Sequence, residues 1–157
     1  MTTQLTVNQL EALLTTQKEL DQTDQPIDLK DAQTAFTVQF FEWFNAFGEY
    51  KYWSTKPDRN TQLKALAKLL AHALTITNQR HTKPHHLDEI VNENNTETFE
   101  NGLEFENQKY TVLFIHELPK MTYSRKIILP LHITFAIAKK YYSIGELINT
   151  YIKEVKQ

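Results

Sequence analysis

The 157-residue sequence contains no cysteine, only three glycines and only five prolines. Without cysteine the chain has no disulfide, no thiolate metal site and no thiol nucleophile, which is typical of a protein from a reducing compartment. The scarcity of glycine argues against a glycine-rich phosphate loop. With so few glycines and prolines, a turn-rich all-β fold is also disfavoured, and we expect an all-α protein.

Neither sign of charge dominates, and no apolar run is long. The 17 basic and 19 acidic side chains give a formal net charge of −2, so no overall field would attract nucleic acid or an anionic membrane surface. The first residues, MTTQLTVNQLEALL, lack the basic and apolar stretches of a signal peptide or a membrane span. We therefore expect a soluble, cytoplasmic protein of one domain, residues 1–157, without nucleic-acid or membrane partners.

Apolar residues recur at helical spacing through the first half of the chain. They predict helices over about residues 7–21, 29–47 and 60–79. Thr6 and Asp28 are the predicted N-caps of the first two, and Gly48 is predicted to end the second. The third helix is apolar over a wide arc, so it is predicted to be buried on more than one side. His72 lies on that helix and is expected to be a core histidine with its polar atoms satisfied.

From residue 80 to residue 123 the sequence is rich in Asn, Glu and Thr and follows neither period. We predict an irregular surface insertion here, in which Asn101-Gly102 forms either a tight hairpin turn or part of a loop leading into a helix. Two further helices are predicted after it, with Ser124 and Ser143 as N-caps and with a kink near Pro130 in the first. The sequence therefore predicts a helical bundle with one irregular insertion.

The most specific motif lies in residues 39–57, QFFEWFNAFGEYKYWSTKP. Glu42, Asn45 and the aromatic-Lys-aromatic-Trp-Ser run at residues 50–54 resemble the all-α NTP pyrophosphohydrolases, in particular the dimeric dUTPase-like, MazG-related branch. The corresponding helix of that family reads E-x-x-E-x-x-N-E. Gln17 and Asp21 match the Q-x-x-L-D pattern of its first helix. The resemblance implies a helical homodimer that cleaves a nucleoside triphosphate between its first two phosphates with bound Mg²⁺.

This sequence departs from the family at the acids that hold Mg²⁺. The family places two E-x-x-[ED] pairs on facing helices, and the matching positions are Gln39 with Glu42, and Ala65 with Lys68. Three of the four carboxylates are therefore missing, and Ala46 replaces a further acid of the motif. No Asp or Glu occurs from residue 59 to residue 86, so a shifted alignment does not restore the pairs. One carboxylate holds Mg²⁺ poorly, so we predict a weak or absent metal site.

Two functional classes follow from these departures. The first is a non-catalytic descendant, with Glu42 as a relic of the catalytic and metal-binding acids, that keeps a nucleotide-binding or interaction role. The alternative is an active pyrophosphatase that converts dUTP to dUMP and pyrophosphate with a rearranged metal site. If a nucleotide binds, the resemblance implies a pocket between helices with these substrate-binding residues: Gln17, Asp21, Asn45, Lys51, Trp53 and Lys68.

Several of these residues also have simpler interpretations. Glu42 is either a phosphate-site relic or a solvated helix acid. We predict that the Lys68 ammonium occupies the space of the lost metal and pairs with Glu42, because a lone buried carboxylate is costly. Tyr52 and Trp53 are either ligand-binding or hydrophobic residues that close their loop over the bundle. Polar positions at a helix rim would equally suit the two first-helix residues.

The second predicted helix is unusually rich in aromatic residues. It carries more apolar surface than one face of a small bundle needs, and a second subunit could cover the excess. We therefore predict a homodimer from these side chains: Phe36, Phe40, Phe41, Trp43, Phe44 and Phe47.

Overall fold

The computed structural model describes residues 4–23, 25–80, 86–96, 99–123 and 129–157. The described residues contain helices and no strand, which confirms the all-α class. The elements are α1 (Val7–Leu20), α2 (Leu29–Phe47), α3 (Arg59–Arg80), α4 (His86–Thr96), the 3₁₀ helix η1 (Phe99–Gly102), α5 (Gln108–Tyr123), α6 (Leu129–Tyr141) and α7 (Ile144–Val155). Within these ranges, every helix is too short or too polar to cross a bilayer.

Short polar side chains and one glycine set the ends of the first two helices. Thr6 and Gln9 form a capping box, in which each side chain accepts a hydrogen bond from the other residue's backbone N–H. Asp28 accepts a hydrogen bond from the N–H of Lys30 at 2.7 Å. Gly48 ends α2 with a φ of 70°, a left-handed conformation that glycine adopts without steric cost. The three predicted helix boundaries are thus confirmed.

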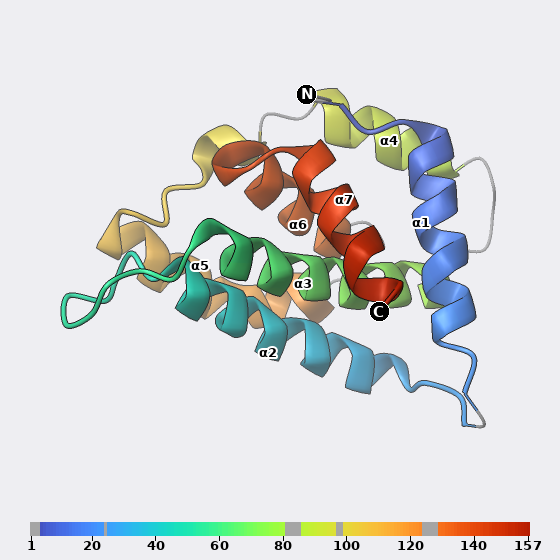
Figure 1. The fold of residues 1–157 in the computed structure, drawn as a ribbon, viewed down its shortest axis with the longest axis horizontal. Helices are drawn as coiled ribbons and strands as arrows, with labels where there is room; N and C mark the ends of the chain where they lie inside the picture. Colours follow the sequence, from blue (N-terminus) through green and yellow to red (C-terminus); the bar gives the residue numbers. More distant parts are fainter. Residues whose placement is uncertain (1–3, 24, 81–85, 97–98, 124–128) are drawn as a thin grey trace.

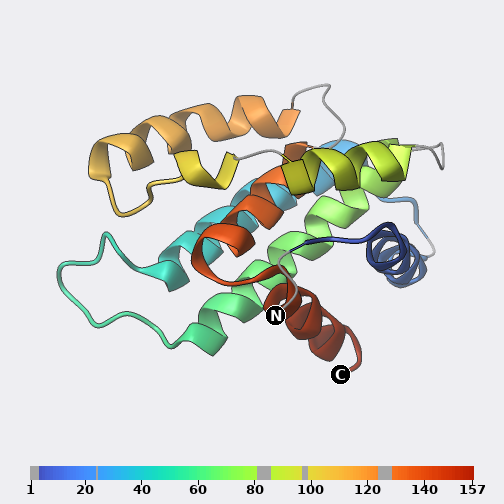
Figure 2. The same ribbon diagram turned by 90° about the horizontal axis from the view of Figure 1, so that it is seen from above.

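The central helix is α3, which packs against α1, α2, α6 and α7. Figure 1 shows α2 and α3 side by side, with α7 crossing α3 and α1 running along one end of the molecule. Figure 2 shows α5 and η1 at one outer edge and α7 at the opposite one. A helix that is surrounded by four others needs apolar residues around much of its circumference, as predicted for α3. The fully buried side chains of α3 include Leu66, Leu69, Leu70, Ala73, Leu74 and Ile76.

The stretch predicted to be irregular, residues 80–123, is mainly helical where it is described, in α4, η1 and α5. The helical period of α5 was hidden because two of its four buried positions are threonines, Thr111 and Thr122, rather than apolar residues. Each hydroxyl donates to a carbonyl four residues earlier, which satisfies it inside the helix. Asn101-Gly102 ends η1 and precedes the loop into α5, so the second of the two alternatives for this dipeptide is confirmed.

The C-terminal helices agree in part with the sequence. Ser143 caps α7, with its hydroxyl accepting from the N–H of Glu146 at 3.1 Å, as predicted. Ser124 lies outside the described residues. Pro130 is the second residue of α6 as described, and residues 124–128 lie outside the described part of the chain. The predicted kink near Pro130 therefore stays a prediction.

The aromatic excess on α2 is covered inside the chain. Five of its six large aromatic residues are buried, and Phe41 is the exception. Phe40 lies 5.5 Å from Phe114 of α5 between ring centroids, and Trp43 lies 5.6 Å from Phe105. Because α5 had been expected to be irregular, this covering layer was not foreseen. The α2 aromatics therefore no longer argue for a second subunit.

Candidate functional site

Two of the positions that the family pattern assigns to metal-binding acids touch each other. Gln39 on α2 is buried, and its Nε2 donates a hydrogen bond to the backbone carbonyl of Ala65 on α3 at 3.1 Å. The Gln39 amide thus contacts the backbone of α3 directly. Neither residue presents a carboxylate to a cation at this point.

The other two positions face water. Glu42 and Lys68 are both exposed, and in the part of the chain that the structure describes no ion pair joins them. The predicted buried pair of Lys68 with Glu42 is therefore wrong. Each charge is solvated, so neither needs the other for compensation.

The residues present do not fit Mg²⁺ held by four carboxylates. Mg²⁺ requires oxygen ligands in near-octahedral geometry, and of the four positions only Glu42 offers one. Among the described residues, no three His, Asp or Glu side chains converge as metal ligands would. A rearranged carboxylate cage is thus not visible in these parts of the chain.

Gln17 and Asp21, two of the predicted substrate-binding residues, lie together in a hydrogen-bonded chain. The Tyr151 hydroxyl of α7 donates to Oε1 of Gln17 at 2.9 Å, and Nε2 of Gln17 donates to Asp21 at 2.9 Å. Thr75 of α3 donates to the other carboxylate oxygen of Asp21 at 2.7 Å. Both ends of the Gln17 amide are therefore engaged, and the chain of contacts ties α1 to α3 and α7.

His72, which sequence reasoning assigned to the core, is half-buried on α3 near two predicted site residues. Burial lowers the pKa of His72, while the negative charges of Asp21 and Glu42 oppose this effect. The two carboxylates therefore lie close enough to act on the same imidazole. At neutral pH the ring is uncharged and can both donate and accept a hydrogen bond. The sequence signal that could have identified His72 as a site residue is its position one helical turn after Lys68.

The loop between α2 and α3 extends beyond the end of the bundle (Figure 1). Tyr52 is 94% exposed and Trp53 62% exposed, so the expectation that they close the loop over the bundle is wrong. The start of the loop is held, because the Tyr50 hydroxyl donates to Asn45 at 2.8 Å and its ring stacks on Phe44. Trp53 is accessible to a ligand.

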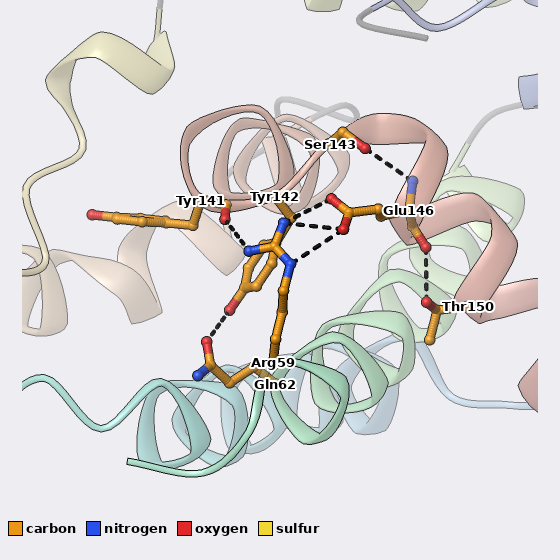
Figure 3. Close-up of polar contacts among 7 residues, drawn as sticks. All are labelled: Arg59, Gln62, Tyr141, Tyr142, Ser143, Glu146 and Thr150. Carbon is orange, nitrogen blue, oxygen red and sulfur yellow. Dashed lines mark hydrogen bonds and ion pairs between the residues drawn. The ribbon is translucent and has the colours of Figure 1, made fainter. Parts of the chain in front are cut away.

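Arg59 anchors the far end of this loop (Figure 3). Its guanidinium donates to both carboxylate oxygens of Glu146, at 2.8 and 3.0 Å from Nη2, and to the carbonyl of Tyr141 at 3.2 Å. These contacts join the start of α3 to the end of α6 and the start of α7. The hydrogen bond from Arg59 lowers the pKa of Glu146, which keeps this carboxylate charged.

Tyr142 lies beneath the same guanidinium, with its ring centroid 5.0 Å from the Arg59 carbon Cζ. Its hydroxyl donates to Gln62 at 2.7 Å and accepts from Nε1 of Trp43 at 3.3 Å. Burial raises the pKa of Tyr142 to about 12. The loop is therefore anchored to the core by a polar network, while its tip is left in solvent.

Ionisation of Tyr151 is predicted to destabilise the fold at high pH. Burial, and then the charge of Asp21, raises the pKa of Tyr151 to about 12, against about 10 in the unfolded chain. Above the unfolded value the unfolded chain binds fewer protons than the folded one. The free energy of unfolding therefore falls as the pH rises from about 10 to about 12.

Urea unfolding at about pH 8 and about pH 11 measures this effect. Tyr151→Phe is expected to lose about 1 kcal/mol at the lower pH, because Gln17 loses a partner, and to show a smaller fall between the two pH values. Tyr52→Phe, at a side chain that is 94% exposed, is the control and should follow the unaltered chain. An undiminished fall in Tyr151→Phe would contradict the assignment.

Comparison with known proteins gives a match at the level of the family. No curated protein matches this sequence. The family model described as dUTPase matches residues 8–156, which is nearly the whole chain. The match includes α4, η1 and α5, the part for which the sequence alone offered no resemblance. The helical fold and this match together show that the chain belongs to the dUTPase family.

Proposed function

We propose that this chain is a single-domain, homodimeric member of the dUTPase family that has lost Mg²⁺-dependent hydrolysis and acts as a nucleotide-binding or interaction protein. The observation that carries the proposal is the hydrogen bond from Gln39 to the Ala65 carbonyl. Gln39 and Ala65 are two of the four positions that the family pattern assigns to metal-binding acids. Without the metal, nothing at this point neutralises the phosphate charge or activates a water for attack.

Binding without hydrolysis is supported by the positive and aromatic side chains around the same helices. Lys68 on α3 is exposed and forms no ion pair with Glu42, so its ammonium is available to a phosphate group. Lys51 and the exposed Trp53 lie in the adjoining loop and provide a second cation and a ring face for a base. In this proposal lysines replace part of the charge that Mg²⁺ supplies in the family.

The test of lost hydrolysis is a pyrophosphate-release assay with dUTP, dCTP and other nucleoside triphosphates at millimolar Mg²⁺ or Mn²⁺. The expected result is no turnover above the buffer background, both in the unaltered chain and in Glu42→Ala. Metal-dependent turnover that Glu42→Ala abolishes would instead establish the active pyrophosphatase.

The test of retained binding is calorimetric titration with a non-hydrolysable dUTP analogue, with Mg²⁺ and with EDTA. We expect an affinity that EDTA leaves unchanged and that Lys68→Ala weakens roughly tenfold, the scale of one lost charge-assisted contact. Lys18→Ala, at an exposed residue of α1, is the matched control. If the analogue binds neither with Mg²⁺ nor with EDTA, the nucleotide-binding role is ruled out and the interaction role remains.

A further inference from the structure

The outer face of α5 carries exposed apolar side chains. Val112 is 67% and Leu113 59% exposed, although both lie in the middle of the helix. Figure 2 shows α5 at an outer edge of the molecule, on the side away from α7. Of the ten large apolar side chains that are exposed among the described residues, five lie on α5 and the neighbouring α2, namely Val38, Phe41, Val112, Leu113 and Tyr123.

The exposed faces of α5 and α2 adjoin. The hydroxyl of Tyr123, at the end of α5, lies 3.2 Å from the hydroxyl of Thr34 on the outer side of α2. Val38 follows Thr34 by one turn on the same side of α2. An apolar surface shared by two adjacent helices is typical of a protein interaction site rather than of scattered exposed residues.

The charges on α5 are self-complementary. Lys109 and Glu117 are both exposed and lie four residues before and four residues after Leu113, so all three share one face of the helix. When a second α5 lies antiparallel with the two Leu113 side chains at a two-fold axis, Lys109 of each chain stands opposite Glu117 of the other. This contact then forms twice, as a symmetric interface requires.

These two charges do not pair within one chain. Eight residues of helix separate Lys109 and Glu117 by about 12 Å along its axis. The partner of Glu117 in the chain is Lys120, at 3.3 Å on the exposed surface. Lys109 and Glu117 therefore cannot neutralise each other within one chain, although they lie at equal distances from Leu113.

We propose that the outer face of α5, centred on Leu113, binds α5 of a second copy of this chain in an antiparallel, two-fold pair. The proposal rests on the proposed homodimer and specifies its interface. The apolar residues at the centre supply most of the affinity, since exposed ion pairs contribute little. The flanking charges set the direction and register of the two helices.

Sedimentation equilibrium of the full chain over a range of concentrations tests the apolar centre of the interface. Leu113→Glu is expected to raise the dimer dissociation constant by about 100-fold or more, because a symmetric interface contains the substitution twice. Leu20→Glu, at a 49% exposed residue near the end of α1, is the control and should leave the constant unchanged. Circular dichroism and thermal unfolding check that both variants fold.

A charge exchange tests the direction of pairing. Lys109→Glu and Glu117→Lys should each raise the dissociation constant about tenfold, because each places like charges opposite one another twice. The double variant should return it to near the original value. Since the two residues are about 12 Å apart within one chain, such a rescue can arise only between chains.

The outcomes separate this interface from the homodimer itself. A dimer whose dissociation constant changes in none of the α5 variants would overturn the α5 interface and leave the homodimer standing. Weakening by the single charge changes without rescue in the double variant would overturn the antiparallel pairing. A chain that remains monomeric at every concentration would overturn both the interface and the proposed homodimer, while the hydrolysis and nucleotide-binding assays would be unaffected.

Discussion

A variant carrying Gln39→Glu, Ala65→Glu and Lys68→Asp is expected to bind Mg²⁺ and to hydrolyse dUTP at least about 100-fold above the buffer background. With Glu42 these changes place a carboxylate at each of the four family positions on α2 and α3. The Gln39–Ala65 hydrogen bond shows that the two helices approach each other at this point. Four carboxylates at these positions supply the oxygen ligands and the charge that Mg²⁺ requires, once the exposed side chains at positions 42 and 68 turn toward positions 39 and 65.

The stability of this variant should depend on the metal. Without Mg²⁺ the triple variant should be less stable than the unaltered chain, because position 39 is buried and a carboxylate there is poorly solvated. Mg²⁺ at about 100 times its dissociation constant should return about 2.7 kcal/mol, since it binds the folded state alone. Thermal unfolding with Mg²⁺ and with EDTA measures this dependence separately from activity.

A variant with the same change of charge at exposed positions is the control. Gln22→Glu, Gln25→Glu and Lys30→Asp alter the net charge equally but lie on the surface around the α1–α2 connection. This control should show neither metal-dependent stability nor hydrolysis. If the triple variant also showed neither, the assignment of the four positions to a lost metal site would be wrong.

Trp43→Ala is expected to lower the free energy of unfolding by about 3–5 kcal/mol. Trp43 is fully buried, and its ring centroid lies 5.1 Å from that of Phe47 and 5.8 Å from that of Phe40. Its Nε1 also donates to the Tyr142 hydroxyl, which would lose a partner. For a chain of this length the loss corresponds to a fall of roughly 10 °C in the melting temperature.

The chain contains one other tryptophan, Trp53, so the control can remove the same type of side chain. Trp53→Ala removes the same side chain from a position that is 62% exposed, so it should change the free energy of unfolding by about 0.5 kcal/mol or less. Urea unfolding of both variants, followed by circular dichroism, provides the comparison. Equal losses in the two variants would contradict the division of this segment into a buried helix and a projecting loop.

The helix boundaries that were predicted correctly depend on contacts between residues close in sequence. Thr6 bonds to Gln9, Asp28 to Lys30, and Gly48 ends its helix by its own conformation. Such interactions are the same in most folds that contain the helix, so a sequence pattern identifies them. By contrast, α5 was missed because buried threonines interrupted its apolar period.

The candidate site was predictable only as a set of positions. The sequence indicated that Gln39, Glu42, Ala65 and Lys68 belong together, but not which of them face one another. The structure brings Gln39 to Ala65 and leaves Glu42 and Lys68 in solvent. Residues three apart share one broad helix face but still differ by about 60° around the helix axis, and the packing of α2 on α3 decides which of the two is buried.

The sequence by itself determined the helical class and the caps of α1, α2 and α7, because each depends on residue type at a local spacing. Only the tertiary structure decided that α5 covers the aromatic face of α2, that Gln17 bonds to Tyr151 and that Trp53 projects into solvent. Gln17 and Tyr151 are separated by 134 residues. Contacts over such distances follow from the packing of whole helices, which the pattern of any single helix does not specify.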